Sequence, residues 1–381
     1  MPPVFPDSPP HRSVLVFTPG FPGPDDSWFA PPVSETLAAL TSAMSVSVVS
    51  LYYPRIKQTY LWRGVQVTAL GNHDTTRAAR KAAVISAVRH ALSVYPRPDL
   101  FMGVWATEPG MAAVVAGKLC RRPAVVYVAG GEVARLPHIN YGDSRHWDRK
   151  WWIRRVLANA DLVVAPSLWL CDRLRLERAV ETSRLVLSPW GIVPRDFVGA
   201  PRNINTITLL TVAALLPVKG LELLLDAVAQ VQDPRVRLLC VGDGPCRMSL
   251  AHRARRLGIG DRIEWVGWVP HNRVSDYYAT ADGFVHPSFW EAQGVAVLEA
   301  MAAGLPTIAT NVGAAPEAIG LTGGGLVVRP DSVEELAMAI RTMVNHLETF
   351  KSLAREGREM IRSRWDVRVR AEQLADLLRN L

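Results

Sequence analysis

Short apolar runs alternate with longer amphipathic segments along almost the whole chain. Five short runs in the first half carry apolar residues on both faces, which is typical of strands buried on both faces. They cover 13–18, 45–50, 100–104, 124–128 and 162–165. Between them, apolar residues recur every three or four positions, which predicts amphipathic helices. These helices cover 32–44, 75–95, 110–119 and 145–158.

The same alternation resumes after an irregular stretch rich in proline and glycine, 189–204, which we interpret as an interdomain linker. The second series of predicted strands covers 207–212, 237–241, 263–266, 283–286 and 306–310. Its predicted helices cover 220–231, 246–257, 271–281, 295–303, 332–346, 349–362 and 367–378. We therefore expect an α/β protein with two facing, doubly wound, Rossmann-like domains. A ligand cleft should lie where the carboxyl ends of their strands meet.

The clearest candidate chemistry lies in the stretch 288–310. A polar turn, 291–294, precedes an apolar helical run, so its free backbone N–H groups and the positive end of the helix dipole suit a phosphate. Glu291 and Glu299 flank the start of this helix. Continuous helix would place them roughly 12 Å apart along the axis, a span that suits an elongated anionic ligand.

Both carboxylates are expected in apolar company, because Phe289 and Trp290 precede Glu291, and Val297 and Leu298 precede Glu299. An unpaired carboxylate in such surroundings is costly, which favours a ligand or a specific partner over two surface residues beside a core helix.

Four loops of the second half follow predicted strands and should converge at one edge of the sheet. They are 213–220, 242–245, 267–270 and 288–294. The first contains Lys219 at a helix start, where a lysine adds a mobile positive charge for a phosphate. A solvated surface lysine is the alternative, and the neighbouring glutamate stretch favours the phosphate interpretation.

Length and composition narrow the class of protein. A chain of 381 residues, 49% of them hydrophobic, is long enough for two cored domains. No apolar run approaches the ~20 residues of a membrane span, and the N-terminus lacks the features of a signal peptide. The four cysteines are scattered, which predicts neither disulfides nor a zinc site and fits a reducing cytoplasm.

The net charge of +8 is unevenly distributed. Residues 1–190 carry 22 Lys and Arg against 14 Asp and Glu, whereas the remainder carries 21 of each. A basic first half suggests an anionic partner, either a membrane surface or an anionic substrate, although many soluble domains carry such a surplus without one.

Two basic segments strengthen the case for a membrane. Arg77, Arg80 and Lys81 share one face of a predicted helix, and 145–155 is a helix rich in arginine and tryptophan. Both suit a peripheral enzyme that acts on a lipid-linked acceptor at an anionic membrane. The alternative is a solvated charge run with core tryptophans. No nucleic-acid recognition module is visible, so nucleic acid is not an expected partner.

The four loops together resemble the donor-site signature of family-4 retaining glycosyltransferases. The matching motifs are Glu291-x7-Glu299 within 287–313, Leu216-Pro-Val-Lys-Gly220, Val241-Gly-Asp-Gly-Pro245 and Val266-Gly-Trp-Val269, in the family's order and spacing. The resemblance implies a GT-B fold with a first, acceptor-side domain at 1–190, a donor domain at 191–364 and a last helix, 365–381, that crosses back to the first domain. It also implies a nucleotide-diphosphate sugar as co-substrate, most simply a UDP- or GDP-sugar, with no metal and no other cofactor.

The resemblance also implies roles for individual residues. Glu291 and Lys219 would be catalytic, with Lys219 on the diphosphate. The donor would further contact Gln293, Gly294, Val295, Glu299, Gly267, Trp268 and Gly242. Within this set, Glu299 would bind the ribose and the Gly267–Trp268 loop the base, while the backbone of 293–295 would hold the sugar and phosphates.

The chain departs from the family pattern at several places. The usual arginine beside the lysine is replaced by Ala214, and the usual histidine after a first-domain strand by Ala129. Met102 and Val104 stand where histidines are frequent. First-domain contacts to donor or acceptor are expected among Gly20, Gly23, Gly131, Glu132, Arg135 and His138, the last two also explicable as surface residues.

Three hypotheses follow from these features. The first is a cytoplasmic, metal-independent retaining glycosyltransferase with an acceptor that is a glycan, a lipid-linked sugar or a small molecule. The second, motivated by Ala214 and Ala129, is a degenerate GT-B protein that binds a nucleotide or serves as a partner subunit without turnover. The third is an isomerase of the same fold that acts on the nucleotide sugar alone.

Overall fold

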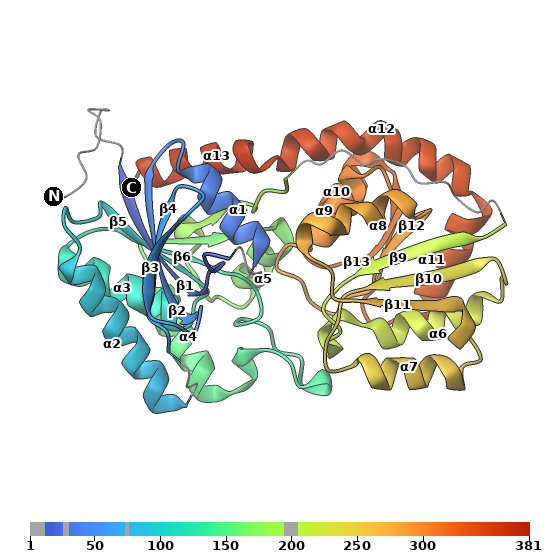
Figure 1. Ribbon diagram of the computed structural model, residues 1–381, viewed down its shortest axis with the longest axis horizontal. Helices are drawn as coiled ribbons and strands as arrows, with labels where there is room; N and C mark the ends of the chain where they lie inside the picture. The colour runs from blue at the N-terminus through green and yellow to red at the C-terminus, as the bar shows by residue number, and fades with distance from the viewer. Residues whose placement is uncertain (1–11, 26–29, 73–75, 194–204) are drawn as a thin grey trace.

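A computed structural model describes residues 12–25, 30–72, 76–193 and 205–381. Two α/β domains lie side by side, each built around its own sheet (Figure 1). The prediction of two Rossmann-like domains is therefore confirmed. Part of the predicted linker, 194–204, and the predicted helix start at Thr75 lie outside the described residues.

The N-terminal domain contains eight described strands and five described α-helices. The strands are β1 (Ser13–Gly20), β2 (Ser45–Tyr53), β3 (Gln58–Trp62), β4 (Val65–Ala69), β5 (Leu100–Val104), β6 (Ala124–Tyr127), β7 (Leu162–Ala165) and β8 (Leu185–Leu187). The helices are α1 (Pro31–Leu40), α2 (Arg77–Ser93), α3 (Glu108–Cys120), α4 (Trp147–Asn159) and α5 (Leu168–Leu176).

The strand order of this sheet is β3-β4-β2-β1-β5-β6-β7-β8, and every pair is parallel except the antiparallel β3–β4 hairpin at one edge. Successive residues of β1 enter opposite layers, because Val14 packs with α1 and α13 whereas Leu15 packs with α2 and α3. The strand is buried on both faces for this reason, as its unbroken apolar run predicts.

The C-terminal domain contains a parallel sheet of six described strands in the order β11-β10-β9-β12-β13-β14. The strands are β9 (Ile207–Val212), β10 (Val236–Val241), β11 (Ile263–Gly267), β12 (Gly283–His286), β13 (Thr307–Thr310) and β14 (Gly325–Val328). The helices are α6 (Leu221–Val231), α7 (Arg247–Arg256), α8 (Val274–Thr280), α9 (Val295–Ala302), α10 (Ala315–Thr322), α11 (Val333–Asn345) and α12 (Leu347–Trp365). One face packs against α6, α7 and α11, and the other against α8, α9, α10 and α12.

The last helix, α13 (Val367–Arg379), belongs by its packing to the N-terminal domain. Ala371, Leu374 and Leu378 are buried in the same core as α1 and β1. Figure 1 shows α12 and α13 in red, running along one side of both domains. The chain thus passes between the domains twice among the described residues.

The two chain segments that pass between the domains are hydrogen-bonded to each other. The Ile192 N–H donates to the Trp365 carbonyl at 2.7 Å, and the Val367 N–H donates to the Ile192 carbonyl at 2.9 Å. Gly191 allows this approach, because a Cβ at that position would lie 2.2 Å from the Cα of Val367. The junction between the domains is therefore a short two-stranded crossing rather than a single tether.

Candidate functional site

The four predicted loops of the C-terminal domain meet at the carboxyl edge of its sheet. The Leu215 N–H donates to the Asp243 carbonyl at 2.9 Å, and the Phe289 N–H donates to the Val218 carbonyl at 2.8 Å. Gly242 and Gly267 form an antiparallel bridge with an N···O distance of 2.8 Å. Backbone hydrogen bonds thus connect all four loops into one site.

Glu291 is at the centre of a polar cluster in this site. Its Oε1 accepts from the Lys219 ammonium at 2.6 Å and from the Ser288 hydroxyl at 2.8 Å, and it lies 2.8 Å from His286 Nε2. Burial raises the pKa of the Glu291 carboxyl, but the charge of Lys219 and the hydrogen bond to His286 outweigh it, so the net pKa is lowered. The carboxylate is therefore held ionised and fixed in place.

His286 and Ser288 are site residues that the sequence analysis did not single out. His286 is the last residue of β12 and is 3% exposed. Among the described residues its Nδ1 is buried without a hydrogen-bond partner. Its Nε2 faces the Glu291 carboxylate at 2.8 Å, so a hydrogen on that nitrogen is donated to Glu291.

Glu299 lies in the second turn of α9, on the side facing α8. It accepts a hydrogen bond from the Tyr278 hydroxyl at 3.1 Å, and its Oε1 is 3.6 Å from His271 Nε2. Burial, and then the nearby Glu299 carboxylate, raise the pKa of Tyr278. A small cavity of about 20 Å³ lies beside these side chains and is also lined by Ile192 of the crossing.

The start of α9 has free backbone N–H groups, as the sequence suggests, and the preceding Gln293 makes an additional contact with the interdomain segment. Gly294 adopts φ +80°, and no described residue accepts a hydrogen bond from the N–H of Gly294 or Val295. The side chain of Gln293 turns away from this helix start: its Oε1 accepts from the Trp190 N–H at 2.9 Å and its Nε2 donates to the Trp190 carbonyl at 2.7 Å. Gln293 thus fastens the loop to the interdomain segment, while the free N–H groups remain available to an anion.

The region predicted to hold a base combines two glycines of positive φ, Gly242 and Gly267, with an exposed ring. Gly242 has φ +129°, and a Cβ there would lie 1.9 Å from the Ala213 carbonyl oxygen. Trp268 is 59% exposed. The Arg247 guanidinium donates to the Trp265 carbonyl at 3.3 Å and would lie 3.1 Å from a Cβ at Gly267, so it adds a cation that the sequence analysis missed.

In the N-terminal domain, Glu132 is buried and its carboxylate is occupied by backbone groups. It accepts from the N–H groups of Ala129 at 2.8 Å, Gly130 at 2.7 Å and Ala106 at 3.2 Å. Burial raises the pKa of this carboxyl, against the effect of these N–H donors. Its side chain therefore binds two loops to each other.

The other predicted residues of this domain are spread over three places. Gly20 ends β1, where its carbonyl accepts from the Thr18 hydroxyl, and Gly23 lies buried in the loop that follows. A Cβ on Gly131 would lie 2.8 Å from the Tyr141 hydroxyl. Arg135 and His138 are exposed, and the His138 ring packs edge-on against Phe289 with centroids 5.5 Å apart. His138 thus contacts the glutamate loop directly.

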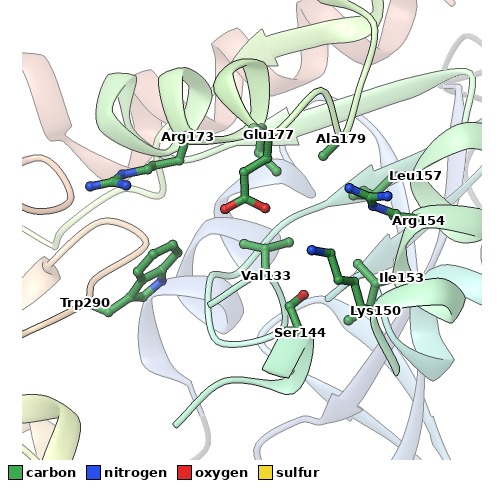
Figure 2. A pocket seen from close by; sticks show the side chains of 11 residues that line it. Val133, Ser144, Lys150, Ile153, Arg154, Leu157, Arg173, Glu177, Ala179 and Trp290 are labelled. Carbon is green, nitrogen blue, oxygen red and sulfur yellow. The ribbon is translucent and has the colours of Figure 1, made fainter. Parts of the chain in front are cut away.

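The glutamate loop also forms the contact between the domains. The Trp290 indole donates to the Gly130 carbonyl at 3.1 Å, and the Ser167 hydroxyl donates to the Ala292 carbonyl at 2.6 Å. Figure 2 shows Trp290 on one side of a cavity of about 20 Å³, into which Glu177 and Lys150 also point. Within the described ranges, no group of three His, Cys, Asp or Glu side chains could hold a metal ion.

Part of the chain matches a known protein family, and the chain is similar in sequence to known glycosyltransferases. Residues 195–360 match the family Glycosyl transferases group 1. The chain is 28% identical over 289 residues to the putative teichuronic acid biosynthesis glycosyltransferase TuaC of Bacillus subtilis, covering 73% of this chain and 69% of that protein. It is 26% identical over 230 residues to the phosphatidylinositol N-acetylglucosaminyltransferase gpi3 subunit of Schizosaccharomyces pombe, covering 59% and 50%.

The fold resembles a solved structure over almost its full length. Anabaena Alr3699/HepE in complex with UDP and glucose superposes with a TM-score of 0.77 at 19% identity, covering 97% of this chain and 100% of that one. At this identity the match establishes the architecture. The chain spans only about half the length of the fission yeast relative.

Proposed function

Because residues 195–360 belong to glycosyl transferases group 1 and the whole chain has the GT-B fold, we propose that this protein is a retaining, metal-independent glycosyltransferase. It takes a sugar from a nucleotide-diphosphate sugar, a UDP- or GDP-sugar, and delivers it to an acceptor held by the N-terminal domain. Glu291 and Lys219 are the residues to which we assign the chemistry.

The observation that carries the proposal is the Lys219–Glu291 pair in front of the free N–H groups of α9. A retaining transfer creates positive charge on the sugar and negative charge on the departing diphosphate. An ionised carboxylate stabilises the first, and an ammonium beside a helix N-terminus stabilises the second. The sequence contains no Asp-x-Asp element, which agrees with a diphosphate held by Lys219 and backbone amides rather than through a metal.

The direct test compares wild type with Glu291→Ala in hydrolysis and transfer from UDP- and GDP-sugars. We expect the variant to lose a factor of about 10² to 10³ in kcat, as for other groups that stabilise transition-state charge. Glu264→Ala, which removes an exposed carboxylate from β11, is the matched control and should behave as wild type. Equal rates for wild type and Glu291→Ala would exclude the assigned role.

A membrane-linked acceptor on the cytoplasmic face is the acceptor class we favour. The name of the fission yeast relative places its acceptor among phosphatidylinositol lipids, and that of the Bacillus relative places it in teichuronic acid synthesis. Trp147 and Trp151 are 83% and 56% exposed on the basic helix α4, which suits peripheral contact with anionic lipid. In the described part of the chain, no helix is long and apolar enough to cross a membrane.

A nucleotide-binding protein or partner subunit without turnover is the second candidate. Ala214 is exposed where the family carries an arginine, and the name of the fission yeast relative describes a subunit. Nucleotide binding by calorimetry, with no turnover across a panel of donors and acceptors, would favour this candidate. Product formed from the nucleotide sugar without acceptor would instead indicate an isomerase.

A further inference from the structure

A large pocket of the N-terminal domain lies away from the glutamate loop, among the first turns of α2, α3 and α4. It has a volume of about 470 Å³. One wall carries Arg77 and Lys81 from α2, the opposite wall carries Trp147 and Trp151 from α4, and Glu108 lies at the start of α3 between them. Three helices of at least 13 residues therefore direct their positive ends toward one hollow, an arrangement that favours an anion.

Two cations of the pocket have no ion-pair partner among the described residues. Arg80 lies 3.5 Å from Glu108, so those two charges offset each other. Arg77 and Lys81, one helical turn apart, form no ion pair with any carboxylate in the described ranges. Asp148 is the opposing charge on the α4 wall. Arg149 and Asp143 form a second ion pair, so the Asp143 carboxylate does not offset the charges of Arg77 and Lys81.

The aromatic wall indicates what accompanies the anion. Trp147 and Trp151 lie four residues apart on α4 and expose 83% and 56% of their surface, an unusual state for so large an apolar side chain. An indole ring offers a flat apolar face to a sugar ring, a glycerol unit or the interface of a bilayer. The preferred occupant thus has a phosphate and an apolar or ring-shaped portion next to it.

A chain of hydrogen bonds links the wall of the pocket to the glutamate loop. The Ala106 N–H, directly before the pocket residue Thr107, donates to Glu132, and the same carboxylate accepts from Gly130. Gly130 in turn accepts from Trp290 next to Glu291. One buried carboxylate therefore fixes the wall of the pocket relative to the glutamate loop.

We propose that this pocket binds a phosphate group of the acceptor through Arg77 and Lys81, with the tryptophans against its neighbouring apolar portion. The identification of the bound molecule as the acceptor rests on the proposed glycosyltransferase function. The phosphate is either that of a soluble phosphorylated compound or that of a lipid headgroup in a membrane.

The experiment compares Arg77→Ser/Lys81→Ser with Arg89→Ser/Arg97→Ser, a control that removes two exposed cations of the same domain outside the pocket. All proteins carry Lys219→Met, which weakens phosphate binding at the glutamate loop to the same extent in each. Binding of glycerol 3-phosphate is followed by phosphorus NMR line broadening. Binding to vesicles of phosphatidylcholine, with and without phosphatidylglycerol, is followed by sedimentation at low salt.

We expect the pocket variant to bind at least one probe about tenfold or more weakly than the control, because two charge-assisted contacts are lost. Loss with glycerol 3-phosphate assigns a soluble phosphate, whereas loss with the anionic vesicles alone assigns a lipid headgroup. Arg77→Lys/Lys81→Arg should restore binding. Equal binding of both probes by the pocket variant and the control would overturn the proposal.

Donor hydrolysis, measured with Lys219 intact, separates this proposal from the proposed function. The pocket variant should hydrolyse the nucleotide sugar as wild type does, because the donor loops are unchanged. The wild type could show no donor turnover and yet bind phosphate through Arg77 and Lys81. That result would refute the proposed function and leave the pocket as an anion site. Normal donor turnover, together with phosphate binding that does not depend on Arg77 and Lys81, would refute the pocket proposal and leave the proposed function standing.

Discussion

Replacing Lys219 by methionine removes the cation that faces Glu291 and keeps a side chain of similar length. At an effective dielectric constant of about 20, two unit charges 2.6 Å apart attract each other by about 6 kcal/mol. The desolvation of two side chains that are only 23% and 13% exposed offsets much of this attraction. Losing one partner of a buried pair costs about 3–5 kcal/mol. We expect about 3 kcal/mol, since Ser288 and His286 still contact the same carboxylate oxygen.

Amide hydrogen exchange measures this loss where it occurs. The amides of β12 and α9 flank Glu291, and a local loss of about 3 kcal/mol corresponds to exchange roughly a hundredfold faster. The amides of β5, in the other domain, should be unchanged. Lys118→Met, which removes an exposed lysine from α3, is the matched control and should leave β12 and α9 unaffected.

A double-mutant cycle with Glu291→Gln tests whether the two charges act on each other. We expect a coupling of about 2 kcal/mol between Lys219→Met and Glu291→Gln, because each substitution removes the same ion pair. The glutamine retains an oxygen for Ser288 and His286. Effects of the two substitutions that add within about 0.5 kcal/mol would refute the ion pair as a stabilising interaction of this loop.

Three further predictions concern Glu132, Gly191 and the pH dependence of Glu291. Glu132→Ala should lower the unfolding free energy by about 3 kcal/mol, because two buried backbone N–H groups and one half-buried one lose their acceptor; thermal melting against Glu177→Ala checks this. Gly191→Ala should force apart the interdomain crossing, since its Cβ would lie 2.2 Å from Val367, and a larger radius of gyration in solution scattering is the expected result. The pKa of Glu291 is lowered in the fold, so its stabilising effect is complete above the unfolded pKa of about 4.3 and is lost as the pH falls below it. Wild type and Glu291→Gln should therefore differ in stability at neutral pH and converge in acid, and parallel denaturation profiles would contradict the lowered pKa.

The sequence predicts those strands best that are buried on both faces. The predicted bounds of β5, β7 and β9 agree with the structure at both ends. The edge strand β3 was not predicted because only one of its five residues is buried, so its side chains show no continuous apolar run. The short β14 was missed for the same reason, with one buried residue of four.

The site was predictable where its chemistry is local. Glu291 and the start of α9 could be found because a polar turn before an apolar helix is visible within a few residues. His286 could not, since it ends an apolar strand and its contact with Glu291 depends on how β12 leads into the loop. The side chain of Gln293 binds the backbone of Trp190, 103 residues earlier, and no local pattern contains such a contact.

The glutamate loop unites the binding site and the contact between domains because neighbouring residues face different partners. Glu291 faces Lys219 within its own domain, whereas Trp290 and Ala292 on either side are bound to the N-terminal domain at Gly130 and Ser167. Separation of the domains must break both of these hydrogen bonds and so release Trp290 and Ala292, the residues on either side of Glu291. The position of the carboxylate and the contact between the domains therefore depend on three consecutive residues, so a ligand that needs Glu291 in its observed place also favours the observed arrangement of the domains.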